Sequence, residues 1–267
     1  MLALKACSAV LLLHITFFSV KGQYNDSATA AAYACDTFSL RQSWKNADKK
    51  QKSHSVTWLA PAMMVLYGLS SIENRELKNI NQEFKEEIYA EHPHNKVSID
   101  NYLQFAPAIA VFGLNATGIK GCHDLRDRSM LYLLSNVIVN TTVASVKKIS
   151  HERRPDGSDY ASFPSGHTAE AFASATFMWE EYKEVSPWYG LAGYAVATAT
   201  GYLRMYNNKH WFSDVVAGAG VGILSTRLAY LIYPAIQHKL RKSKPLRTLI
   251  IPSYHYGSFD LGLVHQF

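Results

Sequence analysis

The sequence has few cysteines, few charged residues and no long run of like charge. Three cysteines in 267 residues, with no CxxC pair or Cys/His cluster, exclude a disulfide-stapled scaffold and a structural zinc site. Charged residues make up 18% of the chain against 48% hydrophobic residues, which excludes a disordered chain. The formal net charge of +6 favours anionic partners, but the even spread of that charge does not indicate nucleic acid.

The first 22 residues have the pattern of a signal peptide. Lys5 is followed by an apolar run from Ala6 to Val20 that is too short to span a bilayer comfortably. We therefore expect cleavage after Gly22 and export to the periplasm or cell envelope. A buried N-terminal helix is the alternative interpretation.

The rest of the chain divides into three parts. Residues 23–53 are polar and predict an N-terminal arm, and residues 54–236 predict an all-α domain with six apolar helices. Residues 237–267 predict a basic linker and a short β-hairpin about Gly257 and Ser258. The six expected apolar helices are 54–72, 101–118, 129–146, 167–183, 188–203 and 211–236. Small residues crowd the last two, which indicates close helix packing. Residues 73–92 predict a further, amphipathic surface helix.

One group of polar residues lies where a helix begins. Pro164-Ser165-Gly166-His167 stands at the start of an apolar helical pattern. Backbone N–H groups at a helix start, together with the helix dipole, form an anion site. We expect the N–H groups of Ser165 and Gly166 to face an anion, with His167 beside it.

Two further groups add a nucleophile and positive charge. His210 and Asp214 are four residues apart, so a helical turn places the carboxylate beside the imidazole and leaves one ring nitrogen free as a nucleophile. Lys147, Arg154 and Arg204 carry the charge that phosphoryl oxygens require. Each group alone also suits a solvated loop, a capped helix or a surface pair, but their combination predicts phosphoryl transfer.

These three groups resemble the motifs of the type 2 phosphatidic acid phosphatase superfamily. That superfamily includes bacterial acid phosphatases, lipid phosphate phosphatases and vanadium haloperoxidases. Its pattern is Lys, six residues, Arg-Pro; then Pro-Ser-Gly-His; then Ser-Arg, five residues, His, three residues, Asp. The chain matches it from Lys147 to Asp214, except that Leu203 stands where the family usually has Ser.

The resemblance implies a six-helix bundle and a role for each site residue. His210 would attack phosphorus to form a phosphohistidine, Asp214 would orient it, and His167 would protonate the leaving oxygen and then activate water. The phosphoryl oxygens would be held by Lys147, Arg154, Ser165, Gly166 and Arg204. Such enzymes need no metal or other cofactor, so Asp156, Asp159 and Glu170 are expected to support the loops rather than bind a metal.

The sequence leaves the substrate and the surroundings of the bundle open. A lipid phosphate and a small phosphorylated molecule both fit, as phosphate monoesters or pyrophosphates. Three spans before Lys147 would place the site in the cytoplasm if the mature N-terminus is outside, so an exported soluble or membrane-associated enzyme is favoured over a six-span one. A vanadium haloperoxidase and a non-catalytic envelope protein that binds anionic lipid are the alternatives. The oligomeric state is not indicated.

Overall fold

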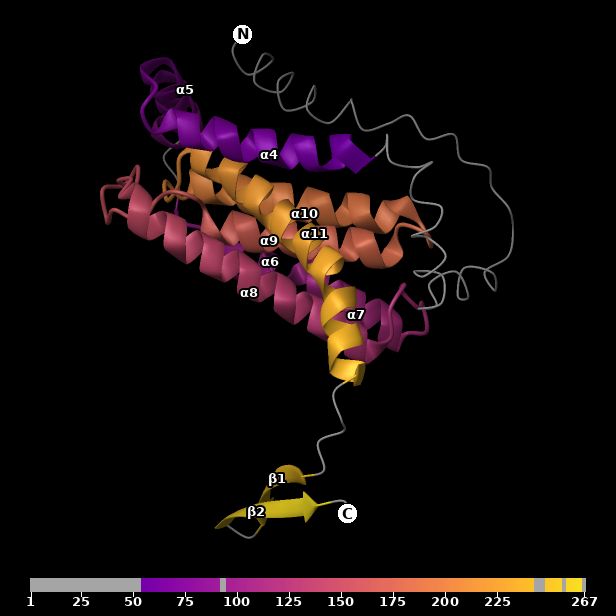
Figure 1. Cartoon of the computed structure of the whole chain (residues 1–267). Helices are drawn as coiled ribbons and strands as arrows, with labels where there is room; N and C mark the ends of the chain where they lie inside the picture. The colour runs from indigo at the N-terminus through magenta and orange to yellow at the C-terminus, as the bar shows by residue number, and fades with distance from the viewer. Residues whose placement is uncertain (1–53, 92–94, 243–247, 256–257, 266–267) are drawn as a thin grey trace.

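The computed structural model describes residues 54–91, 95–242, 248–255 and 258–265 (Figure 1). The predicted signal peptide and arm, residues 1–53, lie outside these ranges. The described part is helical up to residue 242, which confirms the predicted all-α class. The helices are α4 (His54–Ser71), α5 (Arg75–Lys85), the π-helical turn η2 (Glu86–Ala90), α6 (Asp100–Leu103), α7 (Ala106–Ala116), α8 (Leu125–Ser150), α9 (Gly166–Tyr182), α10 (Pro187–Tyr206) and α11 (Phe212–Lys242).

Two strands follow the helices. β1 (Thr248–His255) and β2 (Ser258–His265) are antiparallel, with Thr248 opposite His265.

Several of the predicted helices have different bounds in the structure, and two of these differences have a clear local cause. The expected helix 101–118 is split into α6 and α7, because Pro107 occupies the first turn of α7 and disfavours helix before it. The expected helix 129–146 runs from Leu125 to Ser150. Asp124 caps its start by accepting a hydrogen bond of 2.8 Å from the Asp127 N–H.

Helix α9 is the central helix of the bundle and packs against α7, α8, α10 and α11. In Figure 1, α11 crosses close to α9 and α10. A Cβ added at Gly222 of α11 would lie 2.2 Å from the carbonyl oxygen of Ala169, and one at Gly218 would lie 2.6 Å from that of Ser165. This confirms the close approach that the small residues predict, and it brings the starts of α9 and α11 together.

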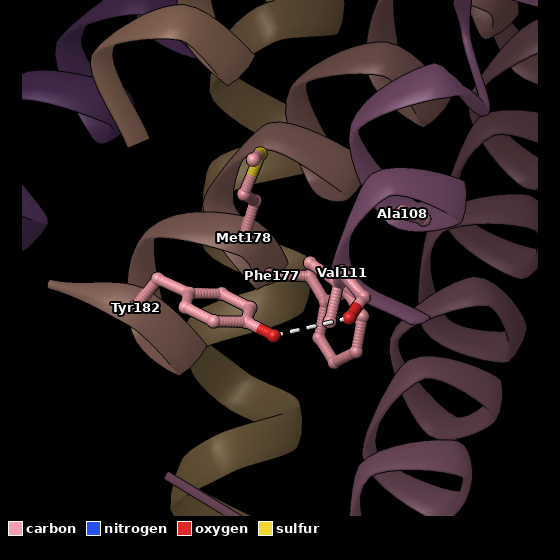
Figure 2. Close-up of a cluster of buried hydrophobic side chains, with 5 residues drawn as sticks. All are labelled: Ala108, Val111, Phe177, Met178 and Tyr182. Carbon is pink, nitrogen blue, oxygen red and sulfur yellow. Dashed lines mark hydrogen bonds between the residues drawn. The ribbon is translucent and has the colours of Figure 1, made fainter. Parts of the chain in front are cut away.

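A buried cluster fixes α7 against the far half of α9. Ala108 and Val111 of α7 pack on Phe177, Met178 and Tyr182 of α9 (Figure 2). The Tyr182 hydroxyl donates to the carbonyl oxygen of Val111 at 3.2 Å. This cluster lies toward the end of α9 opposite His167, so it supports the bundle without contributing to the predicted site.

Within the described ranges, two helices are long and apolar enough to cross a membrane: α8 and the Phe212–Gln237 part of α11. Only 22% of the most apolar stretch of α8 is buried inside the bundle. Its exposed face carries Met130, Leu133 and Val137, at helical spacing. Helix α4, which packs on α11, exposes a similar stripe made of Leu59, Met63 and Leu66.

Candidate active site

The predicted site residues come together at the end of the bundle where α11 begins. Lys147 lies in the last turn of α8, Arg204 in the last turn of α10 and Asp214 in the first turn of α11. His167 is in the first turn of α9, and Arg154 and His210 lie in loops between these helices. Burial, followed by the charges of Arg204, Lys147 and Arg154, holds the pKa of His210 well below its usual value. The three cations therefore act on one imidazole.

His210 and Asp214 lie side by side and are almost wholly buried. The Nδ1 atom of His210 is 3.5 Å from Oδ2 of Asp214, longer than a normal hydrogen bond, and among the described residues this nitrogen has no hydrogen-bond partner. The Asp214 carboxylate accepts hydrogen bonds from the Ser162 hydroxyl and, at 2.9 Å, from the Trp211 N–H. It is thus fixed from two sides while it faces the imidazole.

The start of α9 differs from the expectation in one respect. The Ser165 N–H donates to the backbone carbonyl of Asp214 at 3.0 Å, and the Ser165 hydroxyl pairs with that of Thr168 at 2.8 Å. The close approach of α11 thus provides the Ser165 N–H with a backbone acceptor that the sequence did not indicate, and its contact with an anion stays a prediction. The N–H of Gly166, the first residue of α9, is then the next backbone donor at this helix start that could bind an anion.

His167 has a partner that the sequence did not indicate. Its Nε2 atom lies 2.9 Å from the side-chain oxygen of Asn101, in α6. Burial and then the positive charge of Arg204 lower the pKa of His167 to about 4. The neighbouring Asp100 pairs with Arg204, Oδ2 to Nη1, at 2.6 Å. No motif or periodic pattern marks Asp100 or Asn101, so only their place in the fold reveals them.

Two of the predicted phosphate-binding cations also hold the loop between α8 and α9. The Lys147 ammonium donates to the backbone carbonyls of Ala161 and, at 3.3 Å, Ser162. Arg154 Nε lies 2.8 Å from Oδ1 of Asp159. Both cations are thereby fixed relative to the loop that joins α8 to α9.

The acidic residues near the motifs support loops and helices. Asp156 forms an ion pair with Lys209, and Asp159 accepts a hydrogen bond of 2.8 Å from the Ala161 N–H. Desolvation is the largest single effect on Asp156 and raises its pKa. The hydrogen bonds from Lys209 and Ser158 together exceed it and lower the pKa to about 2. Glu170 is buried and accepts from the Tyr132 hydroxyl at 3.1 Å. Within the described ranges, no three His, Cys, Asp or Glu side chains gather as a metal site would require.

Helix α5 covers the His210 side of the site. The Asn81 side chain makes two hydrogen bonds to Ser213, of 2.9 Å to its hydroxyl and 3.1 Å from its N–H, and Phe84 stacks on Phe212. A narrow pocket lined by Asn81, Phe84 and other residues reaches His210. Beside it, a recess of about 370 Å³ is lined by Trp211 and residues 152–157, which include Arg154. The two hollows share Pro155 and Trp211 in their walls.

Comparison with known proteins supports a family relationship. Residues 129–237 match the family model of the PAP2 superfamily, and this range includes all three motifs. A lipid A 1-phosphatase of Porphyromonas gingivalis is 43% identical to the chain over 135 residues. The match covers 50% of this chain and 30% of that protein, so the chain spans under a third of the curated relative it matches.

Two solved structures resemble the chain more distantly. LpxE of Aquifex aeolicus is 20% identical, with a TM-score of 0.37 over 64% of this chain and 93% of that one. A PAP2-type phosphatidylglycerolphosphate phosphatase of Bacillus subtilis is 18% identical, with a TM-score of 0.43 over 69% of this chain and 98% of that one.

Proposed function

Because the chain belongs to the PAP2 superfamily, we propose that it is a phosphatase that hydrolyses a phosphate monoester or pyrophosphate of a lipid through a phosphohistidine. One observation carries the proposal: three cations, two histidines and a carboxylate from four helices and two loops meet at one end of the bundle. Phosphoryl transfer requires little beyond such positioning and charge neutralisation.

In the first step, His210 is the nucleophile. Its Nδ1 faces Asp214, so Nε2 is the nitrogen that attacks phosphorus. The N–P bond forms as the bond from phosphorus to the leaving oxygen breaks, and His167 gives that oxygen a proton. Asp214 stabilises the positive charge that develops on the His210 ring.

In the second step, water cleaves the phosphohistidine. His167, now neutral, takes a proton from water while the water oxygen attacks phosphorus and the N–P bond breaks. Phosphate leaves and His210 is regenerated. The phosphoryl oxygens are held in both steps by Lys147, Arg154, Arg204 and the Gly166 N–H. Lys147 exchanges a loop carbonyl for a phosphoryl oxygen when substrate binds.

A lipid substrate is supported by the surface of the bundle. Large apolar side chains are exposed in stripes on α4 and α8, and soluble monomers rarely expose such contiguous patches. The relative from Porphyromonas gingivalis is named for action on lipid A, which is a phosphorylated lipid. We therefore assign the stripes to contact with lipid acyl chains, within a six-helix bundle formed by residues 54–236.

The signal-peptide pattern of residues 1–22 supports a site on the exported side of the membrane, with the apolar stripes entering the membrane surface rather than spanning the bilayer. A cysteine introduced at exposed Ser158, in a chain whose own cysteines are replaced by serine, tests this. Labelling of intact cells by a membrane-impermeant maleimide is expected. Labelling only after the cells are broken would place the site in the cytoplasm and overturn the assignment.

The activity is tested with the full chain purified in detergent with EDTA present. Phosphate release from a lipid phosphomonoester is expected from the wild type, and none above background from His210→Ala. After acid-free quenching, a base-stable, acid-labile phosphoryl group should be found on the wild type and be absent from that variant. Undiminished turnover by His210→Ala would reject His210 as the nucleophile, and absence of turnover by the folded wild type on any phosphate ester would reject the function.

A further inference from the structure

The segment before α7 is fixed against the end of α10 by buried polar contacts. The Asn207 side chain accepts from the Val97 N–H at 2.9 Å and donates to the Val97 carbonyl at 2.7 Å. Three residues further on, Asp100 is 1% exposed and pairs with Arg204. Asn207 and Arg204 are one turn apart on α10, so the segment is held at two points on one helix end.

This attachment places Asn101 against the predicted acid of the reaction. Its amide oxygen lies 2.9 Å from Nε2 of His167. An amide oxygen can only accept, so Nε2 carries a proton in this contact and the lone pair of neutral His167 is on Nδ1. Nδ1 is then the atom that gives its proton to the leaving oxygen and later takes one from water.

We propose that Asn101 is a positioning residue of the phosphatase reaction: its side-chain oxygen fixes the orientation and tautomer of His167 so that Nδ1 transfers the proton. The inference rests on the proposed function and extends the site beyond the residues of the three motifs. It also gives a role to residues 97–101, which lie outside the range matched by the family model.

The surroundings of His167 explain why such a partner is useful. The groups whose charges act on His167 are Arg204, Arg154 and Lys147, which disfavour its cationic form, and Asp100, which favours it. A neutral acceptor on Nε2 stabilises the N–H that both the neutral and the cationic ring present. It therefore orients the ring without fixing its charge, which suits a group that must give and then regain a proton.

The experiment compares two substrates that differ in their need for an acid. Full-length chain in detergent is assayed on an alkyl phosphate, whose leaving group needs a proton, and on p-nitrophenyl phosphate, whose leaving group does not. For Asn101→Ala, kcat/KM on the alkyl ester is expected to fall at least about tenfold, and on the aryl ester by much less. Tyr102→Ala is the matched control, because Tyr102 is on the same helical turn and is 77% exposed.

A second comparison separates positioning from a loss of structure. Asn101→Asp keeps an acceptor oxygen and adds a negative charge, so it should retain most activity on the alkyl ester and move the alkaline limb of its pH profile upward. In a double-mutant cycle, Asn101→Ala should cost almost nothing more once His167 is alanine. Equal losses on both substrates, or additive losses in the cycle, would overturn the proposal. An inactive wild type would instead reject the function on which it rests.

Discussion

The Asp100 carboxylate lies 2.6 Å from the Arg204 guanidinium, and both side chains are almost wholly buried. Among the described residues, Asp100 is the only acidic side chain that pairs with Arg204, and Arg204 Nε has no hydrogen-bond partner. Since Leu203 replaces the usual serine beside this arginine, Asp100 takes a main part in holding it. A second anion, the substrate phosphoryl group, can still bind to the unpaired side of the guanidinium.

Asp100→Ala should therefore reduce both stability and activity. Removal of the carboxylate leaves Arg204 charged, buried and unpaired, which typically costs about 3–5 kcal/mol in free energy of unfolding. The thermal midpoint in detergent should fall, and kcat/KM should fall even at temperatures where the variant is folded. Inorganic phosphate at high concentration should restore part of the midpoint, because it can pair with Arg204. An unchanged midpoint would show that the ion pair contributes nothing to the fold.

The close packing of α9 and α11 predicts a second pair of results. Gly222→Ala would place a Cβ 2.2 Å from the Ala169 carbonyl oxygen, so the helices must separate and the starts of α9 and α11 must shift. We expect a loss of about 1–3 kcal/mol in stability and a clear loss of activity. Gly113→Ala is the control: it lies in α7, and its added Cβ would meet nothing within 4 Å. That variant should be as stable as the wild type or slightly more so.

Sulfate binding is expected to depend on pH through His167. The pKa of His167 in the free site is about 4, lowered by burial and by Arg204, so the ring is neutral near pH 6. A bound sulfate favours the cationic ring, so binding takes up a proton and affinity rises as pH falls. Since sulfate stays a dianion, its Kd by calorimetry should decrease from pH 7 to pH 5. His167→Gln should weaken this dependence. A Kd that is constant over the range would contradict it.

Much of the site could be predicted because several of its residues are brought together by short separations along the chain. The four-residue separation of His210 and Asp214 places them side by side, and the helix that starts after Pro164 places His167 in a first turn. The small residues of 211–236 predicted close packing, which Gly218 and Gly222 confirm. These signals act over a turn or two of helix, which is the range where sequence patterns determine geometry.

The remaining contacts depend on how distant segments meet. Asn101 is 66 residues from His167, and Asp100 is 104 residues from Arg204, with no periodicity that links them. The same reason explains why the acceptor of the Ser165 N–H could not be predicted. A free helix start is a local inference, but the Asp214 carbonyl that occupies this N–H arrives from another helix. Such contacts depend on how distant helices pack, and the pattern of a single sequence does not show which distant residues will meet.

The opposite end of α9 offers a test that separates fold from catalysis. Glu181 is fully buried there, and its carboxylate accepts from Arg128 Nε at 3.2 Å, from the His123 ring at 2.7 Å and from the Tyr230 hydroxyl at 2.7 Å. Glu181→Ala leaves Arg128, which is 1% exposed, without its carboxylate, so the thermal midpoint should drop by several degrees. Because the network lies at the other end of the helix from His167, kcat/KM per folded molecule should stay within about twofold of the wild type. Active-site titration by phosphohistidine trapping gives the folded fraction. A large loss of kcat/KM in the folded fraction would mean that the two ends of α9 are coupled.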